Sequence, residues 1–308
     1  MEHDDAGVPV IRQQDFECAE PIDVFVELDS GRLDIALEEG SADSGGVAVQ
    51  IRADPTSQPA WSAGIGGLLS WLGEQTGAAP AGELAAEAVR RTTIDFTGRR
   101  LSVRSPREFP LRTVPLTIHV RAPTGSSITA RSGSADIAVD GVADRFDAST
   151  GSGQVRAQRC TGSVDIRTGS GDVRLGSVPG GLRVRTGSGE VDVASIDDTV
   201  GAAGGGTVQT GSGDVRLGTV RHNVSARTGS GDLTVVDASA GGLELTTGSG
   251  QLRVGIHSGV RAELDVSSGS GEARSDLPVG GPPSEGDITL RVRARTGSGD
   301  ALVTSAPS

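Results

Sequence analysis

Apolar and polar side chains alternate with a period of two in short runs along the second half of the chain. In the run 172–178, Val173 and Leu175 fall on one face and Arg174 falls on the other. After a glycine break, the run 182–185 alternates leucine and valine with arginine in the same way. This alternation, the frequent β-branched residues and the 47 glycines oppose a helix and predict strands joined by tight turns.

The runs recur with a period of about eighteen residues, and each copy carries a Thr-Gly-Ser-Gly corner followed by an acidic or amide residue and then an aliphatic one. One copy is too small to bury its own apolar face, so the copies have to stack. We expect an all-β fold, a single-stranded β-helix or solenoid with two strands per coil, about 4.8 Å between coils and the corners in one column. The corners begin at Thr150, Thr168, Thr186, Thr210, Thr228 and Thr247, with looser copies at Ser268 and Thr296.

The same pattern predicts the domain organisation. Residues 1–21 resemble an acidic tail, residues 22–304 a β-solenoid interrupted by a small helical or loop insert at 55–92, and residues 305–308 a short tail. A solenoid lengthens without enlarging its core, so 308 residues do not require several domains, and we expect one elongated domain. Aromatic residues form 2% of the chain, which agrees with a narrow aliphatic interior.

The insert at 55–92 departs from the strand pattern. Its segment 82–91 favours a helix by composition. We interpret the insert first as a flap that covers apolar surface and strand edges. Two alternatives are docking onto a protein partner through its two tryptophans and contact with a membrane surface, which its glycines and the absence of lysine disfavour. The candidate partner-binding residues stand near helical spacing: Trp61, Ile65, Leu68, Leu69, Trp71 and Leu72.

Charge is concentrated at the amino-terminal end. The net charge is −12, and residues 1–50 hold thirteen acidic side chains against Arg12 and Arg32, which leaves the remainder close to neutral. Nucleic acid is not an expected partner, because phosphate binding needs clustered basic side chains and stacking aromatics. All 28 basic residues are arginine. We expect the outward arginines Arg174, Arg183 and Arg185, and likewise Arg216, to pair with neighbouring acids on a solvated face.

Targeting and cysteine signals are sparse. The first residues lack a basic region and an apolar run of signal-peptide length, and no segment approaches eighteen uninterrupted apolar residues. We therefore expect a cytoplasmic protein, with the cell surface as the alternative if a leader has been removed.

Cys18 and Cys160 are too few for a disulfide scaffold and are expected to be free or buried thiols.

The residue after each corner forms a predicted polar ladder. Calcium-binding β-rolls take aspartates from both halves of a coil, whereas here the second half carries none, and glutamine replaces the acid in some copies. We therefore expect no calcium, and instead turns capped by serine and aspartate hydrogen bonds to backbone amides. The ladder runs through Gln154, Asp172, Glu190, Asp214, Asp232, Gln251, Glu272 and Asp300.

Catalytic motifs are not evident in the sequence. His3, His119, His222 and His257 are scattered without zinc-like pairing, and the Gly-Ser-Gly corners are too numerous to be nucleophile elbows. We expect no enzyme activity, no cofactor and no metal. A glycan-active β-helix enzyme is the alternative, and its mark would be a groove with two acids and an arginine on one face.

Taken together, the strand 116–123, the corner Ser132-Gly133-Ser134 and the serial Thr-Gly-Ser-Gly-Asp-Val copies resemble the bacterial "putative adhesin" family of unknown function. The resemblance spans about residues 22–304 apart from the insert. It implies β-helical repeats, surface attachment in some members and a link of related proteins to envelope stress. It assigns no catalytic residue.

These observations favour a non-enzymatic scaffold or adhesin-like module that binds a protein partner, which the sequence leaves unidentified. Self-association is the other expectation, because uncovered ends of a solenoid offer unpaired amides and carbonyls for end-to-end stacking into a filament.

Overall fold

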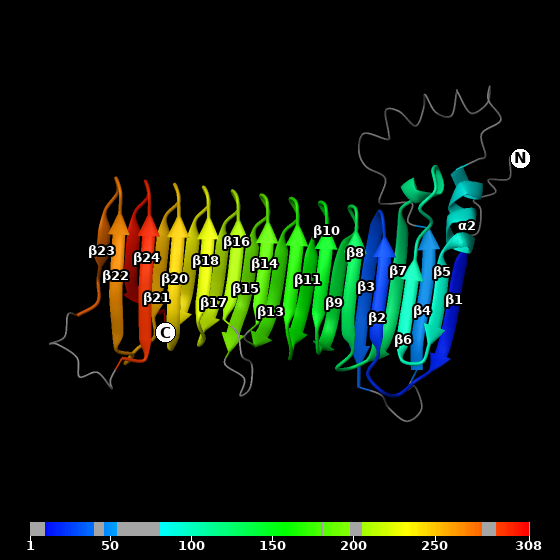
Figure 1. Ribbon diagram of the computed structural model, residues 1–308, viewed down its shortest axis with the longest axis horizontal. Coiled ribbons are helices and arrows are strands. Elements are labelled where there is room, and N and C mark those ends of the chain that lie inside the picture. The colour runs from blue at the N-terminus through cyan, green and yellow to red at the C-terminus, as the bar shows by residue number, and fades with distance from the viewer. Residues whose placement is uncertain are drawn as a thin grey trace, which may run out of the picture. The chain divides into compact units, whose positions relative to one another are not determined.

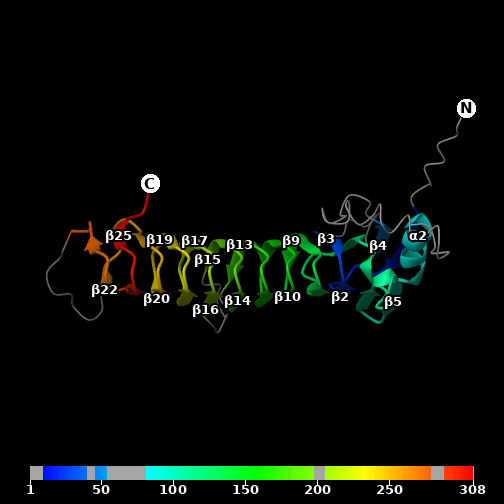
Figure 2. The same cartoon turned by 90° about the horizontal axis from the view of Figure 1, so that it is seen from above.

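The structure is a computed structural model that describes residues 10–39, 46–53, 81–179, 181–197, 205–278 and 288–307. Where the sequence predicted one elongated domain, the contacts divide the chain into two compact units, Met1–Asp140 and Gly141–Ser308. Each unit is built from two facing layers of strands, as Figures 1 and 2 show. The predicted β-solenoid is confirmed.

The carboxy-terminal unit consists of coils that each give one strand to either sheet, and within the described residues its strand pairs are parallel. In one sheet lie β10 (Phe146–Thr150), β12 (Val164–Thr168), β14 (Leu182–Thr186), β16 (Gly206–Thr210), β18 (Val224–Thr228) and β20 (Gly241–Thr247). In the other lie β11 (Val155–Cys160), β13 (Val173–Pro179), β15 (Val191–Asp197), β17 (Val215–Val220), β19 (Leu233–Ala238) and β21 (Leu252–Ile256).

Like residues stack on like residues because successive copies pair in register. Val173 pairs with Val155 on one side and Val191 on the other, and Val184 pairs with Ile166. All of these aliphatic side chains are buried between the two sheets. The alternation read from the sequence therefore assigns the inner face correctly, and the interior is aliphatic and narrow.

The Thr-Gly-Ser-Gly corners form the predicted column, but threonine supplies the hydroxyl where serine was expected. The buried Thr228 hydroxyl accepts a hydrogen bond from the Gly231 amide at 3.0 Å and donates one to the Gly213 carbonyl of the preceding coil at 3.0 Å. Threonine fits because its side chain points inward, where the turn amide has no water, whereas the corner serine faces solvent. The same amide bond is made by Thr150, Thr168, Thr186, Thr210, Thr247 and Thr296.

The aspartates of the polar ladder cap the backbone of the adjacent coil, as expected. The Asp214 carboxylate accepts from the Asp232 amide at 2.8 Å, and Asp232 accepts from the Gln251 amide at 2.8 Å. Glycine is required beside them, because a Cβ at Gly171 would overlap the carbonyl oxygen of Gly153 in the coil below. The corner sequence is therefore dictated by close backbone stacking.

The last two coils stand in the reverse of their chain order. Strands β24 (Leu290–Thr296) and β25 (Ala301–Ser305) lie next to β20 and β21, whereas the earlier strands β22 (Ala262–Ser268) and β23 (Ala273–Ser275) lie outside them. Inward residues of β24 and β25 are buried, whereas β22 is half-buried on its inner face and β23 is exposed. Residue 305, predicted to start a tail, ends β25 because it pairs with Ile256.

The amino-terminal unit mixes parallel and antiparallel strands. One sheet has the order β1 (Ile11–Glu17), β4 (Gly46–Ala53), β7 (Leu116–Pro123), β3 (Gly31–Glu38) and β9 (Asp136–Ala143), and the other β8 (Ser127–Ser132), β2 (Asp23–Leu28), β6 (Arg100–Arg104) and β5 (Thr93–Thr97). A short 3-10 helix, η1, spans Leu111–Thr113. Strand β4 runs antiparallel to β1 and β7, and β5 antiparallel to β6. These antiparallel strands depart from the predicted regular solenoid.

Residues 1–21 were predicted to form an acidic tail, but the structure shows strand β1 at Ile11–Glu17 within this range. Its alternate residues face inward, and Phe16 on β1 stacks on Phe96 of β5 with ring centroids 4.9 Å apart, which links the edges of the two sheets. The helix expected at 82–91 is α2 (Ala81–Arg91), which buries Ala88 and Val89. The Arg12 guanidinium donates to the Thr92 carbonyl at 2.6 Å, directly after the last turn of α2.

Candidate binding site

The central strand of the second amino-terminal sheet carries an aromatic side chain on its outer face. Even-numbered residues of β2 are buried, so Asp23, Phe25 and Glu27 point outward. The neighbours of Phe25 in register are Ser102 on β6 and Thr129 on β8. Phe25 is half-buried, because arginine side chains from both neighbouring strands lie against it.

Three guanidinium groups surround the Phe25 ring. The guanidinium carbons of Arg100 and Arg104 on β6 lie 6.0 and 5.3 Å from the ring centroid, and that of Arg131 on β8 lies 5.7 Å from it. These are cation–π distances. Within the described residues none of the three arginines forms an ion pair with a carboxylate. We call Phe25, Arg100, Arg104 and Arg131 the arginine cluster.

Two nearby carboxylates, those of Glu27 and Asp29, lie within ion-pair distance of other arginines. In register, Glu27 stands between Arg104 and Arg131, yet its carboxylate binds the Arg107 guanidinium, at 2.6 Å to one of the oxygens. Asp29 lies 3.4 Å from the Arg112 guanidinium. Asp23 faces Arg100 in register but forms no ion pair with it, so within the described residues no carboxylate lies at ion-pair distance from any of the three guanidinium groups.

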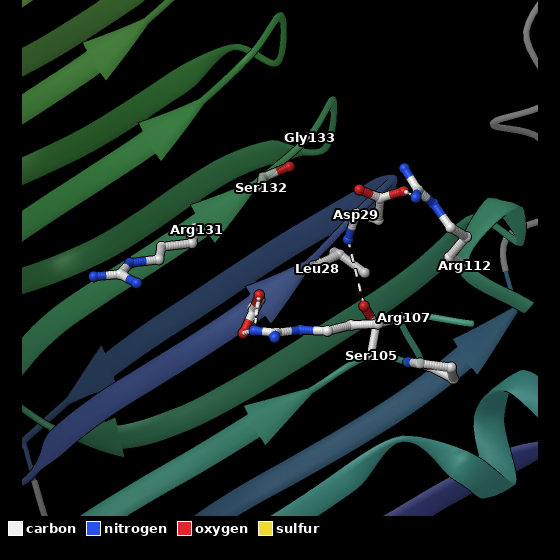
Figure 3. A pocket seen from close by; sticks show the side chains of 10 residues that line it. Leu28, Asp29, Ser105, Arg107, Arg112, Arg131, Ser132 and Gly133 are labelled. Carbon is white, nitrogen blue, oxygen red and sulfur yellow. Dashed lines mark hydrogen bonds and ion pairs between the residues drawn. The ribbon is translucent and has the colours of Figure 1, made fainter. Parts of the chain in front are cut away.

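A hollow of about 400 Å³ opens beside the cluster. Figure 3 shows Asp29 and Arg112 facing each other at one side, whereas Arg131 extends along the sheet away from Asp29. Ser105 helps to fix this wall, because its hydroxyl accepts from the Asp29 amide at 3.4 Å. The hollow is lined by Glu27, Leu28, Asp29, Ser105, Pro106, Arg107, Arg112, Arg131, Ser132 and Gly133.

The carboxy-terminal unit has a second hollow, of about 520 Å³, on the outer face of β20, β22 and β24. It holds three acids and two arginines, the combination that would mark a glycan-active site. Each acid is engaged: Glu244 lies 3.0 Å from Arg227, Glu263 lies 3.0 Å from Arg291, and Asp265 lies 3.2 Å from Arg293. These carboxylates form ion pairs that join neighbouring strands.

The sequence-predicted partner-binding residues Trp61, Ile65, Leu68, Leu69, Trp71 and Leu72 lie outside the described residues. Of the outward arginines, Arg174 pairs with Asp172 at 3.4 Å as expected. Arg183, Arg185 and Arg216 make no ion pair in the described part of the chain, which corrects that expectation. Register explains the difference for Arg185, whose neighbours are Arg167 and Gln209.

The remaining titratable groups are dispersed. His119 lies 3.4 Å from Asp34, and His257 lies 3.0 Å from Asp237. Burial raises the pKa of the Cys160 thiol to about 12, so this thiol stays neutral and unreactive. In the described ranges no three histidine, cysteine or acidic side chains gather as a metal site. The described helices include none long and apolar enough to cross a membrane.

The arginine cluster was not predicted from the sequence, because its members are far apart in the chain. A local signal did exist. In this strand Val24, Val26 and Leu28 form the inner face, so Phe25 stands at a position where the alternation predicts an outward, polar side chain. An aromatic residue on an outward phase suggests a surface contact. Its partners, however, depend on β2 pairing with both β6 and β8.

Comparison with known proteins identifies the repeat region. Residues 118–202 and 195–303 match the Toastrack DUF4097 family model, and together they cover more than half of the chain. No protein of curated function matches the sequence.

Similar solved structures include a putative adhesin from Bacteroides fragilis, which is 12% identical in sequence. The similarity covers 96% of this chain and 97% of that chain, and the TM-score is 0.42. Another is a putative lipid binding protein from Parabacteroides distasonis, with 11% identity, 96% and 97% coverage and a TM-score of 0.43. Identities and TM-scores at this level do not indicate a shared function.

Proposed function

The chain belongs to the Toastrack DUF4097 family, and from its own geometry we propose that it is a non-enzymatic, adhesin-like binding module of the cell envelope. The observation that carries this proposal is the state of the acids in the two hollows. All five carboxylates there, those of Glu27, Asp29, Glu244, Glu263 and Asp265, lie within ion-pair distance of an arginine.

Ion pairing of this kind favours binding over catalysis. A glycosidase requires one carboxyl group that gives up a proton and a second carboxylate that faces the sugar, and both must be free to act. In both hollows each acid instead lies within ion-pair distance of an arginine. Exposed guanidinium groups, in contrast, suit recognition of a surface ligand by charge and hydrogen bonds.

Cosedimentation with purified bacterial cell walls tests the proposal. We expect the intact protein to pellet with the walls and to release no soluble sugar fragments from them on prolonged incubation. Release of new reducing ends would contradict the non-enzymatic role and favour the glycan-active alternative. Failure to pellet with any wall preparation would contradict the adhesin-like role.

Localisation separates an adhesin from an intracellular scaffold. An adhesin-like module needs its binding face outside the cytoplasm, whereas the sequence favoured the cytoplasm. Protease treatment of intact cells, followed by detection of the protein, distinguishes the two cases. Cleavage in intact cells supports surface attachment, and full protection together with recovery in the cytoplasmic fraction would leave only the scaffold role.

A further inference from the structure

We infer that the arginine cluster binds the anionic groups of an acidic polysaccharide. This inference rests on the proposed binding function and names the ligand chemistry. Its basis is the convergence of Arg100, Arg104 and Arg131 on one aromatic ring, with no carboxylate partner in the described residues.

Three like charges converge on the Phe25 ring. Three cations that lie within 6.0 Å of one ring centroid repel one another, and the ring attraction offsets this only in part at an exposed site. An anion placed among the three guanidinium groups removes the repulsion and accepts charge-assisted hydrogen bonds from them. The repulsion among the three guanidinium groups therefore favours binding of an anion at this site.

The positive charge of the cluster contrasts with the charge of the rest of the protein. The chain has a net charge of −12, so an anionic polymer is repelled by the molecule as a whole and can bind only where positive charge is concentrated. Glu27, the acid nearest in register to Arg104 and Arg131, is already bound to Arg107. Asp23 faces Arg100 in register, so the three arginines and this one acid leave a net positive charge here in an otherwise acidic protein.

The hydroxyl groups beside the arginines and the adjoining hollow favour a sugar polymer as the ligand. Ser102 and Thr129 flank Phe25 in register on the same outer face, which places alcohol groups between the arginines. The adjoining hollow of about 400 Å³ offers Arg107, Ser105 and Ser132 to a second sugar unit. Sulfate, phosphate or carboxylate groups on a sugar chain satisfy the guanidinium groups, and sugar hydroxyls satisfy the serines and threonine.

Other anionic partners fit less well. Asp23 lies on the same outer face as Phe25 and faces Arg100 in register. A flat membrane surface would bring anionic headgroups against Asp23, whereas a polymer chain can place its anionic groups at Arg104 and Arg131 and leave Asp23 uncovered. Nucleic acid needs aromatic platforms open for stacking, and the Phe25 ring already contacts three guanidinium groups. An acidic polysaccharide needs neither a uniformly basic face nor a free ring.

Titration calorimetry with dextran sulfate, and with uncharged dextran as the matched polymer, tests the inference. We expect dextran sulfate to bind and dextran not to bind. The double variant Arg104→Gln, Arg131→Gln should raise the Kd about tenfold, and high salt should weaken wild-type binding. The control is Arg183→Gln, Arg185→Gln, which removes two exposed arginines that also lack an ion pair but flank no aromatic ring, and it should change the Kd less than about twofold.

Several results would overturn the inference: equal loss of affinity in both double variants, equal binding of dextran and dextran sulfate, or no binding of dextran sulfate. Binding to anionic lipid vesicles without binding to dextran sulfate would overturn it in favour of a membrane. Cosedimentation of the Arg104→Gln, Arg131→Gln variant with cell walls separates polysaccharide binding by the arginine cluster from the proposed adhesin-like function. If that variant pellets like the wild type, the arginine cluster is not the site, and the binding function stands.

Discussion

The Arg293 guanidinium on β24 bonds to the Asp265 carboxylate on β22 at 3.2 Å, although β24 follows β22 in the chain and lies inside it in the sheet. On its other side, Arg293 faces Glu244 of β20 in register. If the coils followed chain order, β22 would lie directly on β20 and Asp265 would face Glu244. Like charges directly opposite each other destabilise a strand pair, so the arginines of β24 favour the reversed order.

Reversal of this charge should therefore loosen the final coil. We expect Arg293→Glu to lower the free energy of unfolding by about 1–2 kcal/mol, because one favourable pair is lost and two repulsive neighbours are created. Hydrogen exchange should show faster exchange of the β22 amides in particular. The matched control is Arg253→Glu on β21, whose register neighbours Thr234 and Leu302 carry no charge. Unchanged exchange in β22 would mean that charge does not set the coil order.

The corner glycines should be intolerant of a single methyl group. Gly171→Ala would place a Cβ on the Gly153 carbonyl oxygen, and relief requires the two coils to separate. We expect a loss of about 1–3 kcal/mol or more, measured as the urea midpoint. Gly82→Ala in α2 is the control, since its Cβ would meet no atom within 4 Å, and alanine should stabilise the helix by about 0.5–1 kcal/mol. Equal effects at both positions would contradict backbone stacking as the reason for the motif.

The corner threonine should be needed for its hydroxyl. Thr228→Val keeps the shape but leaves the Gly231 amide and the Gly213 carbonyl without their hydroxyl partner. We expect this change to cost about 1–3 kcal/mol in chemical unfolding. Thr228→Ser should cost clearly less, because Ser268 makes the corresponding amide bond at 2.8 Å in the last corner of the stack. A serine variant as unstable as the valine variant would instead assign the stability to the methyl group.

Cys160 should govern the loss of stability in alkali. Burial raises the pKa of its thiol from 9.0 to about 12, so above pH 9 the unfolded chain loses this proton while the folded chain keeps it. Stability should be unaffected below pH 9 and should fall by up to about 1.4 kcal/mol per pH unit as the pH rises from 9 toward 12. The chain has no tyrosine and no lysine, so few other groups titrate in this range.

Urea unfolding at pH 8, 9, 10 and 11 measures this dependence, and Cys160→Ala is the control in which most of it should vanish. Persistence of the full slope in Cys160→Ala would assign the alkaline transition to other groups. A thiol reagent at pH 8 gives a second readout. The half-buried Cys18 should react in the folded protein, whereas Cys160 should react only after unfolding.

The sequence by itself determined the repeat, the inner face of each strand and the column of corners. Alternation with a period of two is a local property, so Val173 and Leu175 are inward wherever the strand lies. The corner residues act on the coil directly below, and a constant repeat length brings them together. The helix at Ala81–Arg91 likewise follows from local propensity.

Only the tertiary structure decided which distant segments became neighbours. The arginine cluster arises because β2 lies between β6 and β8, and Phe25 is separated from Arg100 and Arg131 by long stretches of chain. The antiparallel position of β1, which replaces the predicted acidic tail, also depends on its pairing with β4. Local pattern fixes which side of a strand is apolar, whereas the order of strands is set by pairing and by charges such as Arg293 that meet only in the folded sheet.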